Sequence, residues 1–360
     1  EAVPMSAVER VNLRSLDRAG LEAFVHDVLD EDEAVALRLF KEIWQRGVTS
    51  FDEMTTLRRS FRETLAEHAT LDELELARTL HSEDGTIKFL WRLESGRTIE
   101  SVLIPDGHRV TLCVSSQVGC AMACTFCLTG DLGLVRHLTA SEIACQPWQV
   151  QRYLGDAMRI SNLVLMGMGE PLHNLPALVP ALAICLDEHA MNYSHRRITV
   201  STVGLVPKIA ELAAALPVNL AISLNATTEE HRRRIMPVTR KYSMAQLLEQ
   251  CRTVKLPPGK RITFEYVMFA GENDTLDDAE RLRTLLEDIP AKVNLIPYNE
   301  NPGRPTLKRP SDEVVKAFQH YLVSRGTSCS IRATRGIDIS AACGQLGKTA
   351  PAPAPVPPTP

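Results

Sequence analysis

Residues 111–128 contain the cysteine pattern with the clearest chemistry in this sequence. Cys120, Cys124 and Cys127 are spaced C-x3-C-x2-C, and Cys113 lies shortly before them. Thiolates are the usual protein ligands of iron–sulfur clusters, and a cubane cluster normally takes four of them. Three closely spaced ligands leave one iron with an open position, as in catalytic rather than structural metal sites. The pattern therefore predicts a catalytic iron–sulfur centre.

Two other uses of these cysteines are weaker. A zinc site would need a fourth Cys or His at a comparable spacing, and the nearest histidine, His137, lies outside the triplet. Disulfide bonds are disfavoured because the chain has nine cysteines, and because residues 1–12 lack the basic start and apolar centre of an export signal. We therefore expect a reducing, cytoplasmic location, which suits free thiols.

Small and polar residues follow successive strand-like segments between residues 162 and 299. Gly169 and Glu170 follow segment 162–166, where glycines let the backbone approach a ligand and the carboxylate can accept from an ammonium group. Because β/α barrels collect reacting groups at the C-terminal ends of their strands, such residues predict a site for an amino acid and a ribose. A triphosphate is not expected, since the sequence has no G-x4-G-K-[ST] loop. Further residues at such strand ends are Ser201, Ser223, Leu224, Asn225 and Asn299.

Cys343 lies in a glycine-flanked loop after the last strand-like segment. In a β/α barrel this loop returns to the C-terminal mouth, so Cys113 and Cys343 both have a route to the cysteine triplet. The other cysteines lie on helical or strand patterns, and we interpret them as small core residues: Cys145, Cys185, Cys251 and Cys329.

The first part of the chain predicts helices followed by a hairpin. Apolar residues at helical spacing predict three helices, and we interpret residues 1–82 as a helical accessory domain that binds RNA. Alternating segments separated by turn residues predict a β-hairpin extension at 83–108. The three helices are expected at 13–29, 33–46 and 57–66.

Strands and helices alternate through residues 109–347. This alternation predicts parallel β/α units with right-handed crossovers. With about six such units, we expect an α/β fold built as an incomplete (β/α)6 barrel. Residues 348–360 are proline-rich and are expected to be disordered.

The overall composition excludes some function classes. Of 360 residues, 44% are hydrophobic and 23% charged, as in ordinary globular proteins. No apolar run approaches the roughly 20 residues that a membrane span needs. The net charge of −4 gives no general affinity for nucleic acid, so an RNA site must be local. Candidate phosphate contacts, which solvated helix faces would resemble, are the basic clusters at 195–197, 232–234, 240–241 and 308–309.

Seven ordered motifs together resemble one family. They are C-V-S-S-Q-V-G-C-x3-C-x2-C, M-G-M-G-E-P-L, R-R-I-T-V-S-T, A-I-S-L, E-Y-V-M, N-L-I-P-Y-N and D-I-S-A-A-C-G-Q-L. This combination is similar to the RlmN-type dual-specificity RNA adenine-C2 methyltransferases of the radical S-adenosylmethionine (SAM) superfamily. The likeness extends from about residue 10 to 347.

The resemblance implies two cofactors. A [4Fe-4S] cluster would be held by Cys120, Cys124 and Cys127, and two SAM molecules would be used per turnover. Asn225 stands where many relatives have His, although both side chains can donate a hydrogen bond. The implied cofactor contacts are Gly169, Glu170, Ser201, Ser223, Leu224, Asn225 and Asn299.

The resemblance also implies a reaction. One SAM would methylate Cys343, and a second would be cleaved to a radical that activates this methyl group for attack on adenine C2. Cys113 would then resolve the protein–RNA crosslink by forming a disulfide with Cys343, which requires a reductant for turnover. Glu100, on the middle strand of the hairpin extension, corresponds to the proton acceptor.

The expected substrates are large-subunit (23S) ribosomal RNA and the transfer RNA adenosine beside the anticodon. A low-potential donor such as flavodoxin or ferredoxin and a monomeric state are expected with them. Two alternatives stay open: a Cfr-type enzyme that methylates adenine C8, which Pro171 after Glu170 disfavours, and a non-catalytic RNA-binding protein whose cysteines hold metal.

Overall fold

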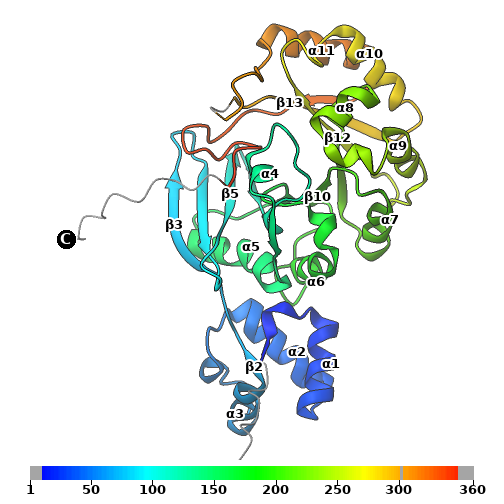
Figure 1. Ribbon diagram of the computed structural model, residues 1–360. Helices are drawn as coiled ribbons and strands as arrows, with labels where there is room; N and C mark the ends of the chain where they lie inside the picture. The colour runs from blue at the N-terminus through cyan, green and yellow to red at the C-terminus, as the bar shows by residue number, and fades with distance from the viewer. Residues whose placement is uncertain (1–9, 301–302, 348–360) are drawn as a thin grey trace, which may run out of the picture.

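The chain begins with a helical region and continues into one large sheet with helices against it (Figure 1). This computed structural model describes residues 10–300 and 303–347, so the predicted disordered tail at 348–360 lies outside the described residues. In the described part, no helix combines the length and apolarity needed to cross a membrane.

The three predicted N-terminal helices are present, with shifted ends. The first begins later than residue 13 because the Asp17 side chain accepts a hydrogen bond from the Gly20 amide and caps the helix there. A short strand pair, β1 (Val11–Asn12) with β2 (Ala69–Thr70), joins the two ends of this region. The helices are α1 (Arg18–Leu29), α2 (Glu33–Lys41), which continues into a π turn (Glu42–Arg46), and α3 (Arg59–His68).

The large sheet has ten strands in the described residues, in the order β14-β13-β12-β11-β10-β9-β6-β5-β4-β3. Strands β6 and β9–β14 pair in parallel, whereas β3, β4 and β5 extend the sheet with antiparallel pairs. Their bounds are Glu75–His81 (β3), Ile87–Arg92 (β4), Thr98–Asp106 (β5), Arg109–Cys113 (β6), Asn162–Leu165 (β9), Ile198–Thr202 (β10), Asn219–Ser223 (β11), Ile262–Met268 (β12), Ala291–Pro297 (β13) and Cys329–Ile331 (β14).

Helices connect the successive parallel strands, so the predicted α/β fold with six crossovers is confirmed. Within the described residues, β3 and β14 are edges that do not pair with each other, which leaves the barrel incomplete. The main helices of this layer are α5 (Ala140–Leu154), α6 (Leu175–Leu186), α7 (Val206–Ala215), α8 (Glu229–Ile235), α9 (Met244–Thr253), α10 (Leu276–Leu285) and α11 (Asp312–Ser324).

Strand β3 was not predicted, because the sequence pattern placed it inside the helical region. It pairs antiparallel with β4 and has an irregular register between Leu76 and Arg78. Its residues are exposed or half-buried, so the strand lacks the alternation of apolar and polar residues that marks a strand in sequence. The hairpin extension therefore has three strands on the outer side of β6 rather than two.

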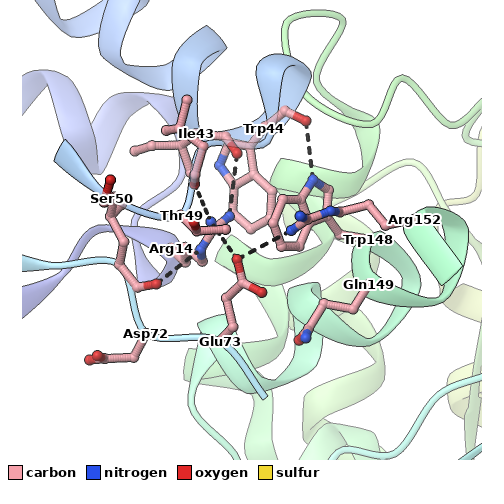
Figure 2. Close-up of polar contacts among 12 residues, drawn as sticks. Arg14, Ile43, Trp44, Thr49, Ser50, Asp72, Glu73, Trp148, Gln149 and Arg152 are labelled. Atoms are coloured by element: carbon pink, nitrogen blue, oxygen red, sulfur yellow. Dashed lines mark hydrogen bonds and ion pairs between the residues drawn. The ribbon is translucent and has the colours of Figure 1, made fainter. Parts of the chain in front are cut away.

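Arg14 joins the helical region to the sheet (Figure 2). Its fully buried guanidinium lies 4.0 Å from the ring centroid of Trp148 on α5 and 5.5 Å from that of Trp44. The indole N–H of Trp148 donates to the Trp44 carbonyl at 3.2 Å. Cation–π contacts and charged hydrogen bonds thus fix the junction. The guanidinium also donates to the Ile43, Val48 and Leu71 carbonyls and to the Glu73 carboxylate.

Helix α5 continues this connection toward the cysteine loop. Gln146, which is fully buried, accepts from the Ser115 amide and the Ser101 hydroxyl, both at 2.8 Å, and donates to the Ser115 carbonyl. The Ser115 hydroxyl in turn donates to the Glu100 carbonyl at 2.6 Å. One helix therefore packs against the N-terminal junction and holds the base of the cysteine loop.

Candidate active site

The cysteine loop begins in a two-stranded ribbon, β7 (Gln117–Gly119) with β8 (Leu134–His137). Gly119 has φ +74°, and a Cβ there would lie 1.8 Å from the Gly133 carbonyl oxygen, so only glycine fits. The Cys120 amide donates to that same carbonyl at 2.8 Å. The ribbon thereby fixes where the loop starts, and the side chains of Cys120, Cys124 and Cys127 all border one pocket.

The donor chemistry of this pocket fits an iron–sulfur cluster. Burial raises the pKa of Cys120 to about 12 and also raises that of Cys127, so both groups are thiols unless a cation displaces their protons. In the described residues, no three His, Cys, Asp or Glu side chains are close enough to bind one metal ion together. A cluster is larger than a single ion and holds its thiolates on different irons, so three thiols that border one pocket fit a cluster better than a single metal ion.

The end of β9 supplies the glycines and the carboxylate expected there. A Cβ on Gly167 would lie 2.7 Å from the Val114 carbonyl, and Gly169, with φ +103°, would meet Gln117 at 2.5 Å. Glu170 is buried, accepts from the Leu172 and Val203 amides, and burial raises its pKa to about 7. Glycine is required at these positions because the backbone packs closely against Val114 and Gln117, and Glu170 borders the pocket beside them.

Strands β10 to β13 bring further polar groups to the same pocket. The Ser201 hydroxyl donates to Glu265 Oε2 at 3.2 Å, and Asn225, at φ +60°, accepts from the Val267 amide. Glu265 Oε1 and Asn299 Oδ1 are buried acceptors without a hydrogen-bond partner, and both residues border the pocket. Buried acceptors that receive no hydrogen bond from the protein fit a ligand that carries donors, such as the amino and ribose groups of SAM.

Two expectations differ from the structure at this point. Leu224 is fully buried and does not border the pocket, so it could contact a cofactor only through its backbone. Arg232, a candidate phosphate contact, is buried beneath the site, and burial lowers its pKa to about 10. That expectation was wrong because its guanidinium binds the protein instead, donating to the Val203, Ser223 and Leu224 carbonyls and to the Thr239 hydroxyl.

Cys343 is held at the edge of the pocket by contacts on both sides of its loop. Asn299 Nδ2 donates to the Cys343 carbonyl at 3.2 Å. The Leu128 amide donates to the Gly344 carbonyl at 2.8 Å, and the Thr129 hydroxyl donates to the Leu346 carbonyl at 2.8 Å. Because Leu128 and Thr129 begin the helix after Cys127, the C-terminal loop and the cysteine loop are fastened to each other.

Cys113 and Glu100 lie behind this loop rather than on the pocket wall. Burial raises the pKa of Cys113 to about 12, and the thiol interacts electrostatically with Cys343 and Arg332. Glu100 is buried with Lys88 at 3.6 Å, and Lys88 Nζ donates to the Ser340 carbonyl at 3.1 Å. Burial raises the pKa of Glu100 and lowers that of Lys88, while their opposite charges counteract both shifts.

All nine cysteines are free thiols, so the structure does not support a standing disulfide. The expected Cys113–Cys343 bond, as a transient species of the reaction, stays a prediction. Cys145, Cys185 and Cys251 are buried core residues, as predicted, and Cys329 is half-buried.

Sequence reasoning missed Lys88, Glu265 and Arg332. Arg332 Nη1 lies 3.8 Å from Glu265 Oε1, and both residues border the pocket beside Cys343. Glu265 could have been recognised from the sequence, because it is a carboxylate within the apolar strand motif E-Y-V-M. Lys88 and Arg332 could not have been recognised in this way, since lysine and arginine are common in exposed strands.

Comparisons with known proteins agree with this geometry. Residues 114–285 match the radical SAM superfamily, and residues 11–71 match the ribosomal RNA large subunit methyltransferase N-terminal domain. A solved structure, a radical SAM methyltransferase from Sphaerobacter thermophilus, has a TM-score of 0.86 and 41% identity, covering 93% of this chain and 99% of that chain.

Two relatives are dual-specificity RNA methyltransferases named RlmN. The one from Anaeromyxobacter sp. (strain Fw109-5) is 51% identical over 94% of this chain and 90% of the relative. The one from Geobacter sulfurreducens is 52% identical over 86% of this chain and 85% of the relative. The chain therefore belongs to the RlmN family of dual-specificity RNA methyltransferases, within the radical SAM superfamily.

Proposed function

We infer that this protein methylates carbon 2 of adenosine in large-subunit (23S) ribosomal RNA and in transfer RNA beside the anticodon, with Cys343 carrying the methyl group. The placement of Cys343 carries this inference. It borders the same pocket as the three cluster-type cysteines, and its loop is hydrogen-bonded to the helix after Cys127. The name of the relatives supports RNA as the substrate class.

Superfamily membership implies a [4Fe-4S] cluster and SAM. We assign the cluster to Cys120, Cys124 and Cys127. When bound, these groups supply a methyl group and the one-electron chemistry that an electron-poor ring carbon needs. Two SAM molecules per turnover follow if Cys343 is first methylated and then activated. The residues assigned to SAM are Gly169, Glu170, Ser201, Ser223, Leu224 through its backbone, Asn225 and Asn299.

Cys113 is assigned as the group that releases the product. Its thiolate attacks Cys343 Sγ, a sulfur–sulfur bond forms, and the bond from Sγ to the RNA-bound methylene carbon breaks. The electron pair of that bond moves to the methylene carbon, which takes up a proton to become the methyl group. Burial and the nearby Cys343 both raise the pKa of Cys113, and Arg332 lowers it and so favours the thiolate. The nearness of the two sulfurs that this interaction implies supports the assignment. A thiol reductant must then restore both cysteines.

Glu100 is assigned as the acceptor of the proton that leaves adenine C2. Its buried Oε2 has no hydrogen-bond partner and lies 3.6 Å from Lys88 Nζ, so this oxygen can accept a proton at the cost of weakening that ion pair. Lys88 connects the carboxylate to the Cys343 loop through the Ser340 carbonyl. The assignment rests on this arrangement together with the family resemblance.

The test is mass spectrometry of nucleosides from ribosomal and transfer RNA treated with reconstituted protein, SAM and a low-potential reductant. 2-Methyladenosine in both RNAs supports the proposal, and in one only it narrows the substrate range. 8-Methyladenosine would assign the chain to Cfr-type chemistry. A metal assay of the purified protein that finds stoichiometric zinc without iron would indicate a non-catalytic protein. Flavodoxin or ferredoxin as donor, a monomeric state and a cytoplasmic location stay predictions.

A further inference from the structure

A second cavity, of about 640 Å³, occupies the interior of the partial barrel. It reaches the N-terminal ends of the parallel strands, where Arg109, Arg197 and Lys292 line its rim. At its other end it reaches Cys343. Six residues border both this cavity and the cofactor pocket: Met166, Glu265, Ile296, Asn299, Arg332 and Cys343. Cys343 therefore lies between two separate approaches.

The wall of this cavity is polar. Along β12, Ile262 and Phe264 pack in the hydrophobic core, whereas Thr263 and Glu265 alternate with them and line the cavity. A closed β/α barrel fills its interior with bulky branched side chains. Here the volume lies within the range of small-molecule sites, and hydroxyl and amide groups can bond to base edges. Other polar lining residues are Thr111, Asn162, Thr199, Asn219 and Asn294.

The charge of the cavity is strongly positive although the chain carries −4 overall. Two of its cations are paired, since Arg335 lies 3.5 Å from Asp106 and Arg332 lies near Glu265. Exposed cations without a carboxylate partner, concentrated at one rim, favour phosphate groups. Among the described residues, the lining cations without an ion pair are Arg109, Arg196, Arg197 and Lys292.

No residue of the other basic clusters borders this cavity. Arg240 and Lys241 are exposed without an ion pair among the described residues, whereas the cations of the other clusters are buried or paired. Arg232 is buried beneath the cofactor pocket. Arg233 and Arg234 pair with Glu229 and Glu272, and Lys308 and Arg309 pair with Glu300 and Asp312. In contrast, Arg196 and Arg197 border the cavity that leads to Cys343.

We propose that the target adenosine approaches Cys343 through this interior cavity, from the N-terminal ends of the strands, while its flanking phosphates bind the rim cations Arg109, Arg196, Arg197 and Lys292. SAM approaches the same sulfur from the opposite side, through the cofactor pocket. A base that is splayed out of a single-stranded loop can enter such a cavity, whereas a stacked base cannot. The proposal rests on the proposed function and specifies its substrate route.

The test is the double variant Arg197→Glu/Lys292→Glu, assayed for two products. Methylation of Cys343 by SAM, read by mass spectrometry of the protein without RNA, should equal that of the wild type because the cofactor pocket is untouched. Methylation of an anticodon stem-loop RNA should fall about 100-fold. The salt dependence of binding to that RNA should also become shallower, because about two phosphate contacts are lost.

The matched control is Arg252→Glu/Lys316→Glu, which makes the same change in charge on the exposed surfaces of α9 and α11. It should retain both products. Wild-type RNA methylation by the cavity variant would overturn the route, and so would loss of Cys343 methylation in that variant, because the cavity would then support the cofactor pocket. If the wild type itself methylates neither Cys343 nor RNA, the proposed function fails instead.

Discussion

The Arg14 junction and the mouth around Cys343 both bury charged side chains, but they differ in how many of their buried polar atoms have hydrogen-bond partners. At the junction, one guanidinium donates to three carbonyls and a carboxylate (Figure 2). One atom there, Trp44 Nε1, lacks a partner. Around the mouth, buried acceptor oxygens of four described residues lack a hydrogen-bond partner: those of Glu100 and Glu265, which are held by ion pairs alone, and those of Asn299 and Gln345.

We infer from this difference that the junction stabilises the fold, whereas the buried groups at the mouth serve the reaction. A buried polar atom without a partner costs free energy, about 1–3 kcal/mol each, so such atoms persist where a ligand or reaction uses them. Paired cations at a junction instead hold two parts of a chain in one arrangement. Changes at the mouth should therefore lower activity far more than stability, and changes at the junction should lower stability far more than activity.

The largest effect is expected at Cys343. Cys343→Ala should lower RNA methylation more than about 1,000-fold, because the other three cysteines that border the pocket are assigned to the cluster and cannot carry the methyl group. Iron content and the unfolding temperature should stay those of the wild type. Protein mass spectrometry measures methylation of the protein, and nucleoside analysis measures methylation of the RNA. Cys329→Ala, a half-buried thiol on the edge strand β14, is the control and should stay active. A methylated cysteine elsewhere in Cys343→Ala would contradict the assignment.

The opposite outcome is expected at the junction. Arg14→Met should lower the free energy of unfolding by about 3 kcal/mol, because carbonyls and the Glu73 carboxylate lose their buried donor. Urea unfolding of samples with equal iron content measures the change. Exposed Arg59→Met should stay within about 0.5 kcal/mol of the wild type. If folded Arg14→Met loses Cys343 methylation at low temperature, the separation between stability and chemistry breaks down.

Local patterns account for what the sequence could predict. The spacing of Cys120, Cys124 and Cys127 lies within one loop, and the alternation of strands and helices is a pattern of neighbouring residues. The fold class and the strand ends around Glu170 could therefore be predicted. A loop after the last strand also predicted the return of Cys343 to the mouth, where the structure places it.

Long-range partners account for what the sequence could not predict. In the sequence, Arg14 and Arg232 resemble ordinary surface arginines. In the fold they are buried, because carbonyls from distant segments accept their hydrogen bonds. The Lys88–Glu100 pair lies across two strands, and Glu265 meets Arg332 only after β12–β14 have paired. The charge of the interior cavity likewise depends on rim residues from separate strands.

A smaller effect is expected for Lys88, which connects the mouth to the neighbouring sheet. Burial raises the pKa of Glu100 and Lys88 opposes this shift, so Lys88→Met should raise that pKa further. A proton acceptor works only when deprotonated, so the acidic limb of RNA methylation should move to higher pH, with about tenfold lower activity on that limb.

The same change has a stability signature. A folded pKa above the unfolded value gives stability that is present at low pH and is lost as pH rises through the folded pKa. Lys88→Met should therefore be destabilised more at pH 8 than at pH 5. Lys88→Arg, which keeps the cation, is the control. An unshifted pH limb in Lys88→Met would show that Glu100 is not the proton acceptor.

The smallest effect is expected where the Cys343 loop meets the hairpin extension. Asp84 accepts from the Gly336 amide at 2.9 Å. Burial opposes ionisation, yet hydrogen bonds from Thr86 and Gly336 lower the pKa of Asp84 to about 2. Asp84 is exposed, so Asp84→Ala should change stability by less than about 1 kcal/mol, and this contribution should fade as pH falls from about 4 toward 2.

Amide hydrogen exchange measures the effect of Asp84→Ala on the Cys343 loop directly. Amides of residues 336–343 should exchange several-fold faster in Asp84→Ala, because the loop loses one of its anchors, while core amides of β12 should not change. Asp274→Ala, which removes a similar hydrogen bond to the Gly271 amide in the turn after β12, should leave the Cys343 loop unaffected. Equal exchange in the two variants would mean that Lys88 and Asn299 hold the loop without Asp84. The remaining hydrogen bonds to the loop, including those from Leu128 and Thr129, would then be enough to hold Cys343 in place.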